Sequence, residues 1–325
     1  MLGRTGLRVP ALGFGCGNVG GLLIRGTPAE RERAVARAIE LGIDYFDTAP
    51  IYGDGRSEEN LGRALRALGA RVHVGTKVRL PDLPPAELPG AVARGLEQSL
   101  RRLGAERVDL FQLHNRITVS GGGGTVSVRD VRDAIVPALA RLAEQGKIGF
   151  YGLTALGDTS ALLDILRGGL THTAQVCYNL VNPSAGQPLP SGFPGQDFGA
   201  RLEPCAERRT GVIVIRALAA GALSGSETRH PVAAPSVDPI GSGGDYAADV
   251  RRARLLSPLI EEGHVASLVE AALRFPLASE AVSTVLLGYS SLEQLEYAAA
   301  CVAKGPLPAA ALARLPALWA SFKTA

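Results

Sequence analysis

The chain has 325 residues, of which 46% are hydrophobic, and its formal net charge at pH 7 is +3. This length is enough for one large barrel domain or two ordinary domains, with a sizeable core in either case. Acidic and basic residues are interspersed, which excludes the basic stripe of a nucleic-acid-binding protein. The longest apolar runs have the length of strands and are too short to span a bilayer, so we expect neither nucleic acid nor membrane as a partner.

The cysteines point to a reducing compartment and away from a metal site. None forms a C-x-x-C pair, and none stands at metal-ligand spacing from a histidine. The first residues contain no apolar stretch followed by a cleavage site. We therefore expect four reduced, mostly buried thiols in a cytoplasmic protein that holds no metal. The four are Cys16, Cys177, Cys205 and Cys301.

Eight short apolar runs recur along the chain. Each is nearly continuous in apolar character, which is typical of parallel strands that are covered on both faces. In chain order the expected strands are Ala11–Gly15, Ile43–Phe46, Val72–Thr76, Val108–Leu113, Ile148–Leu153, Thr173–Cys177, Val212–Ile215 and Val282–Leu286.

Longer segments with helical periodicity separate these runs. The first expected helix is Pro28–Leu41. Ser57 is predicted to be the N-cap of the next helix, because Glu58 and Glu59 then fall in its first turn. The remaining expected helices are Leu88–Leu103, Val131–Gln145, Asp158–Arg167, Ala200–Arg209, Val265–Phe275, Leu292–Val302 and Ala309–Phe322.

This alternation predicts an α/β fold, a (β/α)₈ TIM barrel in which residues 1–325 form a single domain. The alternative is an open, doubly wound sheet, which usually carries a G-x-G-x-x-G turn after its first strand. The segment Gly13–Gly17 comes close to that motif, but no convincing helix follows it. We find no internal repeat and no linker.

Three long segments interrupt the alternation, namely Arg116–Val128, Asn182–Phe198 and Ala217–Asp249. They are rich in glycine, proline or serine, and each follows an expected strand. In a barrel all three would lie on the C-terminal face, where long loops usually shape the active site. The alternative is that they are disordered additions to the surface.

Four residues that can do chemistry stand where expected strands end. Asp47, Lys77 and His114 each directly follow one strand, and Tyr52 lies in the loop after Asp47. Neighbouring strands of a barrel run side by side, so these side chains can converge at one mouth of the barrel. Singly, each has an ordinary structural explanation, such as a helix cap or a charge on the rim; together they favour a shared site.

The four residue types suit proton transfer to a carbonyl oxygen. An unperturbed tyrosine has a pKa near ~10. The ammonium of Lys77 lowers the pKa of Tyr52, and Asp47 keeps Lys77 in place and protonated. His114 can donate a hydrogen bond to the carbonyl oxygen. The set predicts a carbonyl reductase or, in the reverse direction, an alcohol dehydrogenase.

Five motifs resemble those of the aldo-keto reductase superfamily, and the resemblance covers essentially the whole chain. The most specific is Gly42–Gly53, which contains Asp47 and Tyr52. Leu2–Leu7 resembles the family's N-terminal β-hairpin, which caps the barrel floor. The others are Ser57–Gly62, Gly75–Lys77 and Asp109–His114.

The resemblance implies an NAD(P)-dependent oxidoreductase without a metal. It would act on a small-molecule carbonyl or alcohol, meaning an aldehyde, ketone, sugar or secondary alcohol, with Tyr52 as general acid or base. The cofactor would be NADP or NAD. The residues expected to contact it are Gly15, Cys16, Asp47, Thr154, Gln175, Arg216, Leu218, Gly221, Leu223, Gly288, Ser290 and Gln294. The oligomeric state and the individual substrate stay open.

Some positions depart from the family pattern. Thr154-Ala155 stands where the family often has Ser-Asn, and Arg216 stands where many members place an aromatic ring on the nicotinamide. No lysine or arginine lies near Ser290, where many members grip the 2′-phosphate of NADP. These departures favour weak discrimination between the two cofactors and hint at the branch that contains sugar dehydrogenases.

Two other classes of function fit the sequence less well. A barrel that binds cofactor with little catalysis could serve as a regulatory or interaction subunit, but the intact set of four residues argues against it. A metal-dependent hydrolase or isomerase would need a cluster of ligands, and the five histidines are scattered along the chain.

Overall fold

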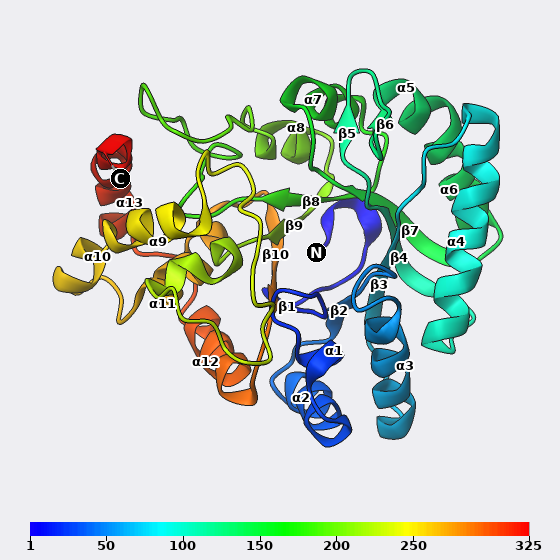
Figure 1. Ribbon diagram of the computed structural model, residues 1–325, viewed down its shortest axis with the longest axis horizontal. Helices are drawn as coiled ribbons and strands as arrows, with labels where there is room; N and C mark the ends of the chain where they lie inside the picture. Colours follow the sequence, from blue (N-terminus) through cyan, green and yellow to red (C-terminus); the bar gives the residue numbers. More distant parts are fainter. Residues whose placement is uncertain (325) are drawn as a thin grey trace.

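Eight parallel strands close into a barrel, and helices surround it (Figure 1). The strands are β1 (Leu12–Gly15), β2 (Tyr45–Asp47), β3 (His73–Val78), β4 (Val108–Leu113), β7 (Ile148–Thr154), β8 (Thr173–Cys177), β9 (Gly211–Ile215) and β10 (Val282–Gly288). The computed structural model describes residues 1–324. The order around the barrel is β1-β10-β9-β8-β7-β4-β3-β2. Because β1 pairs with both β10 and β2, the predicted barrel is confirmed and the open sheet is excluded.

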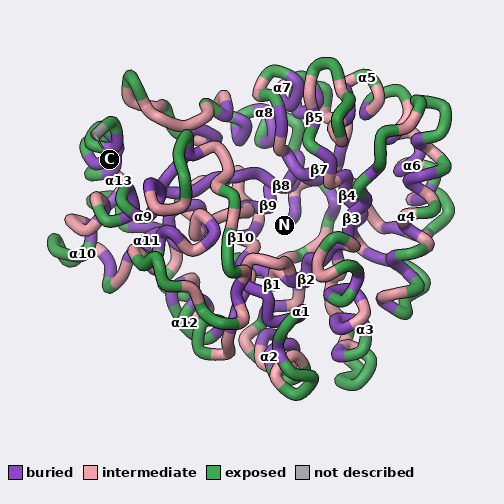
Figure 2. Tube along the Cα trace, in the orientation of Figure 1, coloured by how far each residue is buried: buried purple, intermediate pink, exposed green. Residues whose placement is uncertain are grey.

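The helices that follow the strands form the outer layer. They are α1 (Leu22–Arg25), α2 (Pro28–Glu40), α3 (Arg56–Leu68), α4 (Leu88–Leu103), α5 (Val128–Asp130), α6 (Val136–Glu144), α7 (Thr159–Gly168), α8 (Leu202–Glu207), α9 (Tyr246–Arg254), α10 (Pro258–Glu261), α11 (Leu268–Arg274), α12 (Leu292–Ala303) and α13 (Ala309–Ala320). Figure 2 shows buried segments along the strands and exposed segments on the peripheral helices and loops. No helix within residues 1–324 is both long and apolar enough to cross a membrane.

The barrel floor is covered by a turn where a β-hairpin was predicted. Residues 1–11 contain a 3₁₀ turn, Gly3–Thr5, and no strand, so the hairpin prediction is wrong. The amide of Arg4 donates to the carbonyl of Arg209 instead of to its own segment. Pro10 has no amide hydrogen to extend a ladder. The segment still plugs the floor, because the side chain of Leu2 is fully buried there.

Ser57 does not cap a helix, contrary to the prediction. Helix α3 begins at Arg56, after Gly55 in the left-handed region with φ of 89°. The hydroxyl of Ser57 is buried and donates to the carbonyl oxygen of Cys16 over 2.8 Å. It also lies 2.8 Å from the hydroxyl of Thr48. Ser57 therefore joins the loops that follow β1 and β2, which both lead to the site.

The expected helix Val131–Gln145 begins as a π-helical turn, Val131–Ile135, before α6. Pro137 lacks the amide hydrogen that a regular helix would use to bond four residues back, and a wider turn avoids that requirement.

The three long segments lie on the C-terminal face, as predicted, because each follows a strand. Arg116–Val128 contains a short parallel pair, β5 (Ile117–Thr118) and β6 (Val126–Ser127). The segment between β9 and α9 crosses in front of the barrel (Figure 1). We call residues 225–245 the strap. The guanidinium of Arg25 donates to the carbonyl of Val232 over 2.6 Å, and this contact fastens the strap to α1.

Candidate active site

The four predicted catalytic residues converge at the C-terminal mouth of the barrel. Asp47 ends β2, Lys77 lies in β3, and both are fully buried. The Lys77 ammonium forms an ion pair with Asp47 Oδ1 and donates to the carbonyl of Thr48 over 2.9 Å. Its nitrogen also lies 3.4 Å from the hydroxyl oxygen of Tyr52. A buried ammonium thus links the carboxylate to the phenol.

His114 stands beside the phenol. The rings of Tyr52 and His114 meet edge to face, with centroids 5.8 Å apart and an interplanar angle of 90°. Both residues line the same cavity. The Nδ1 atom of His114 is buried and has no hydrogen-bond partner among the described residues. A carbonyl or hydroxyl group in this cavity can therefore reach both rings.

Burial controls the protonation of these groups. It raises the pKa of Tyr52, the charge of Lys77 lowers it, Asp47 raises it, and the net shift is upward. Lys77 lowers the pKa of Tyr52 as expected, but the net shift of that pKa is upward and not downward as predicted. Burial lowers the pKa of His114 to about 3, with Lys77 and Arg79 acting in the same direction. Tyr52 is therefore a neutral proton donor and His114 a neutral imidazole at pH 7.

Two residues that donate hydrogen bonds to Asp47 were not predicted from the sequence. The hydroxyl of Tyr45 donates to Asp47 Oδ2 over 3.0 Å, and the amide of Gln112 donates to the same oxygen over 3.1 Å. The signal was available in the strand alternation. Tyr45 precedes Asp47 by two residues and Gln112 precedes His114 by two, so each shares the barrel-facing side of its strand.

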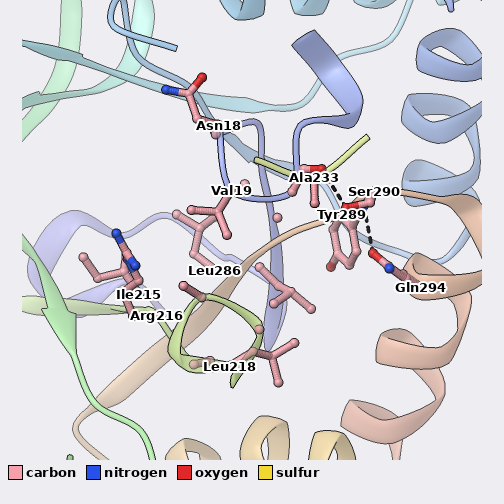
Figure 3. A pocket seen from close by; sticks show the side chains of 18 of the residues that line it. Asn18, Val19, Ile215, Arg216, Leu218, Ala233, Leu286, Tyr289, Ser290 and Gln294 are labelled. Carbon is pink, nitrogen blue, oxygen red and sulfur yellow. Dashed lines mark hydrogen bonds between the residues drawn. The ribbon is translucent and has the colours of Figure 1, made fainter. Parts of the chain in front are cut away.

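A cavity of about 530 Å³ extends from the catalytic residues to the start of α12. Figure 3 shows Arg216 and Gln294 on opposite sides of this cavity. Most residues expected to contact the cofactor line it, but Cys16 and Leu223 do not, because both side chains are buried behind the wall. Those that line it are Gly15, Asp47, Thr154, Gln175, Arg216, Leu218, Gly221, Gly288, Ser290 and Gln294.

The far end of the cavity is formed by β10, α12 and the strap. The amide of Ser290 donates to the side-chain oxygen of Gln294 over 2.8 Å, and the Ser290 hydroxyl donates to the carbonyl of Gly20 over 2.7 Å. Arg229 and His230 of the strap line this cavity and were not predicted individually. The guanidinium of Arg229 donates to the carbonyls of Ala234 and Ala220 and lies over the ring of Tyr246, so Arg229 braces the strap internally and against the segments on either side of it.

Of the three long segments, only Ala217–Asp249 contributes side chains to the cavity wall within the part of the chain that the structure describes. Asn182 of the second segment instead donates to the carbonyl of Gly241, which connects that segment to the strap. One of the three segments therefore forms part of the site directly, and a second contacts the strap that does so.

Comparison with known proteins defines the class. The model of the Aldo/keto reductase family matches residues 11–320, and the chain belongs to this family of oxidoreductases. It is 28% identical to the L-galactose dehydrogenase of Arabidopsis thaliana, over 93% of this chain and 86% of that protein. It is 29% identical to the pyridoxal 4-dehydrogenase of Microbacterium luteolum, over 90% of each.

The same relationship is seen in three dimensions. The holo form of an aldo-keto reductase from Bacillus halodurans superposes with a TM-score of 0.72 at 25% identity. The match covers 98% of this chain and 95% of that one. Among residues 1–324 there is no cluster of histidine, cysteine or acidic side chains that could hold a metal ion.

Proposed function

We propose that this chain is an NAD(P)-dependent oxidoreductase that moves a hydride between nicotinamide and a small-molecule carbonyl or alcohol. The observation that carries the proposal is the phenol of Tyr52, which lines the cavity 3.4 Å from the ammonium of Lys77 and beside His114. Membership of the family supports the reaction class, and two relatives are dehydrogenases by name. We place the whole activity in a single barrel domain.

The cavity suits a dinucleotide. Its volume of about 530 Å³ lies within the usual range for ligand sites, roughly 300–1,000 Å³. Gly15, Gly221 and Gly288 leave parts of its wall without side chains, so a ligand can come close to the backbone there. A nicotinamide cofactor, when bound, donates or accepts the hydride.

We assign the cofactor's contacts from the residues that line the cavity. Gln175 and Thr154 would hold the carboxamide at the catalytic end. Gly221 would lie along the middle of the cofactor, and Ser290 and Gln294 would meet its adenosine end. The cofactor is NADP or NAD.

The protein's own part in the reaction is proton transfer and orientation. In the reductive direction, neutral Tyr52 donates its proton to the carbonyl oxygen as that oxygen gains negative charge. The neutral imidazole of His114 contributes one N–H donor that orients the same oxygen. Lys77 stabilises the phenolate that remains on Tyr52, and Asp47 holds Lys77. In the oxidative direction Tyr52 takes the proton back.

The test is a Tyr52→Phe variant assayed with both cofactors against aldehydes, sugars and secondary alcohols. Turnover is expected to fall by about 10² to 10⁴, the usual contribution of a general acid. The dissociation constant of the cofactor should stay close to the wild-type value. Tyr151→Phe, which removes a hydroxyl outside the cavity, serves as the control.

If Tyr52→Phe kept more than half of the turnover on a substrate whose chemical step limits the rate, Tyr52 would not be the acid. If the wild-type chain bound cofactor but turned over nothing in the panel, the regulatory alternative would replace the enzyme. Dialysis against a chelator should leave the activity intact, because the proposed chemistry uses no metal.

A further inference from the structure

The carboxylate of Asp47 is held on both oxygens. Its Oδ1 pairs with Lys77, while its Oδ2 accepts hydrogen bonds from Tyr45, Gln112 and Gln175 over 3.0, 3.1 and 2.8 Å. None of these five side chains is more than 2% exposed. The donors come from three different strands, β2, β4 and β8, so the carboxylate is held from several sides of the barrel.

A buried carboxylate oxygen without donors is costly, because it has lost its water. The ion pair with Lys77 occupies only one oxygen of Asp47, and the second would be unsatisfied inside the barrel. Three donors on Oδ2 remove that cost and stop the carboxylate from rotating about its last bond. Lys77 is thereby fixed in direction, and the ammonium lies within reach of Tyr52.

The barrel is built to admit Tyr45. A Cβ on Gly13 would lie 2.9 Å from a ring carbon of Tyr45, and a Cβ on Gly75 would lie 3.0 Å from its hydroxyl oxygen. These glycines belong to β1 and β3, the strands on either side of β2. An apolar side chain would fill this layer without leaving a polar atom to satisfy. The hydroxyl of Tyr45 therefore serves Asp47 rather than the packing of the core.

Gln112 also indicates a role towards Asp47 rather than in core packing. Its amide nitrogen is used by Asp47, but its side-chain oxygen is buried and has no partner among the described residues. A residue chosen for core stability would not leave such an acceptor unpaired. The carboxamide of Gln112 is retained at a cost, and the group that gains from it is Asp47.

We propose that Tyr45 and Gln112 are positioning residues that hold Asp47 so that Lys77 sets the proton affinity of Tyr52. This inference rests on the proposed role of Tyr52 as the proton donor. Donated hydrogen bonds stabilise the negative charge of Asp47 and reduce its effect on the phenol. Asp47 raises the pKa of Tyr52 and Lys77 lowers it, so loss of these donors shifts that balance towards Asp47.

The decisive experiment compares Tyr45→Phe and Gln112→Met with the wild-type chain. Each change keeps the side-chain size and removes donors to Asp47. We expect the pKa of Tyr52 to rise by about half a unit to one unit in each variant. The readout is ¹³C NMR titration of ζ-labelled tyrosine, with the Tyr52 signal assigned from Tyr52→Phe. In the oxidative direction kcat should fall about threefold to tenfold at pH 7, because less phenolate is available.

Tyr178→Phe is the matched control, because it removes another buried tyrosine hydroxyl that does not contact Asp47. A purely structural role would lower the melting temperature in all three variants and leave the titration of Tyr52 unmoved. An unshifted Tyr52 signal in both Tyr45→Phe and Gln112→Met would overturn the proposal.

The titration needs no substrate, so it separates this inference from the proposed function. If Tyr52→Phe retained its turnover while the NMR shift appeared, the coupling would stand and the proposed role of Tyr52 would fail. If Tyr45→Phe does not fold, Gln112→Met alone decides the result, because methionine is similar in size to the glutamine that it replaces.

Discussion

The two ends of the cavity are built from different kinds of structure. At the catalytic end, Asp47 and Lys77 stand on adjacent strands, are fully buried and are bonded side chain to side chain. At the far end, His230 and Gln294 are exposed and come from the strap and from the first turn of α12. The strap is attached to the rest of the chain mainly through its backbone carbonyls, as in the contact from Arg25 to Val232, with one ion pair, Glu227 to Arg254.

This difference separates two properties of the molecule. Chemistry that needs sub-ångström placement is carried by the closed barrel, where packing and hydrogen bonds restrict every side chain. Under the proposed function, cofactor entry, retention and selection would depend on the strap, which would have to open in each exchange of cofactor. Substitutions at the first end should change rates and proton affinities, and those at the second should change cofactor exchange.

The largest effect is expected from Lys77→Met. The variant should lose turnover by about 100-fold or more, because nothing then stabilises the phenolate of Tyr52. The pKa of Tyr52 should rise, since the charge of Lys77 lowers it in the wild-type chain. The pH dependence of turnover in the oxidative direction would report that rise.

Lys77→Met also leaves Asp47 as an unpaired buried charge, which typically costs about 3–5 kcal/mol of stability. The double variant Asp47→Asn/Lys77→Met should recover most of the melting temperature and none of the turnover. Recovery of turnover as well would show that the loss came from instability rather than from the missing ammonium.

A smaller effect is expected in the stability of the catalytic end towards acid. The folded chain holds His114 with a pKa of about 3, against an ordinary value of 6.5. Between these values the unfolded chain binds more protons, so stability falls as the pH drops below 6.5. This one group should lower the free energy of unfolding by about 2 kcal/mol between pH 7 and pH 5.

His114→Gln should remove that part of the pH dependence. Urea unfolding of both proteins at pH 5, 6 and 7 gives the comparison. His172, whose pKa is also lowered by burial, is present in both, so the difference isolates His114. Parallel pH dependences in the two proteins would mean that folding leaves the pKa of His114 unchanged.

At the far end, Arg25→Ala should loosen the strap. Its guanidinium donates to the carbonyls of Val232 and Asn18, each over 2.6 Å. Loss of both bonds should speed cofactor release about tenfold, measured by stopped-flow fluorescence of the reduced nicotinamide. Arg33→Ala removes an exposed arginine of α2 outside the strap contact and is the control. Equal release rates in both variants would place the opening step elsewhere.

The smallest effect concerns the choice of cofactor. No lysine or arginine stands in residues 287–295, and Arg229 of the strap is committed to backbone carbonyls. We expect a preference for NADPH over NADH below about 100-fold, because strong selection for a 2′-phosphate usually needs a free basic group. Glu293→Gln should raise that preference by about threefold, since it removes a charge that repels phosphate. A wild-type preference above about 100-fold would show that His230 or Arg229 binds the phosphate after all.

The sequence predicted the catalytic end more completely than the far end for a physical reason. An apolar run that forms a parallel strand fixes where its last residue lies, so Asp47, Lys77 and His114 could be placed together without knowing any loop. The strap has no such periodicity, and the contact between Arg25 and Val232 joins residues about 200 positions apart. Nothing local in the sequence signals that contact.

The remaining misses have the same origin. Serine is a common helix-capping residue, but Ser57 instead donates a tertiary hydrogen bond to the Cys16 carbonyl. The N-terminal segment forms a turn instead of the predicted hairpin, because the Arg4 guanidinium donates to backbone carbonyls across the barrel floor. Tyr45 could have been found by counting two residues back from Asp47 along the strand, a step that uses only the alternation of side chains.

The four cysteines can report which parts of the folded chain have unfolded locally. All are unpaired and buried, and burial raises the pKa of each, that of Cys177 to about 11. Neutral, inaccessible thiols do not react with iodoacetamide, so each alkylated position marks a part of the chain that has unfolded. Mass spectrometry of the labelled peptides would then time the release of α12, at Cys301, separately from the parting of the barrel, at Cys16.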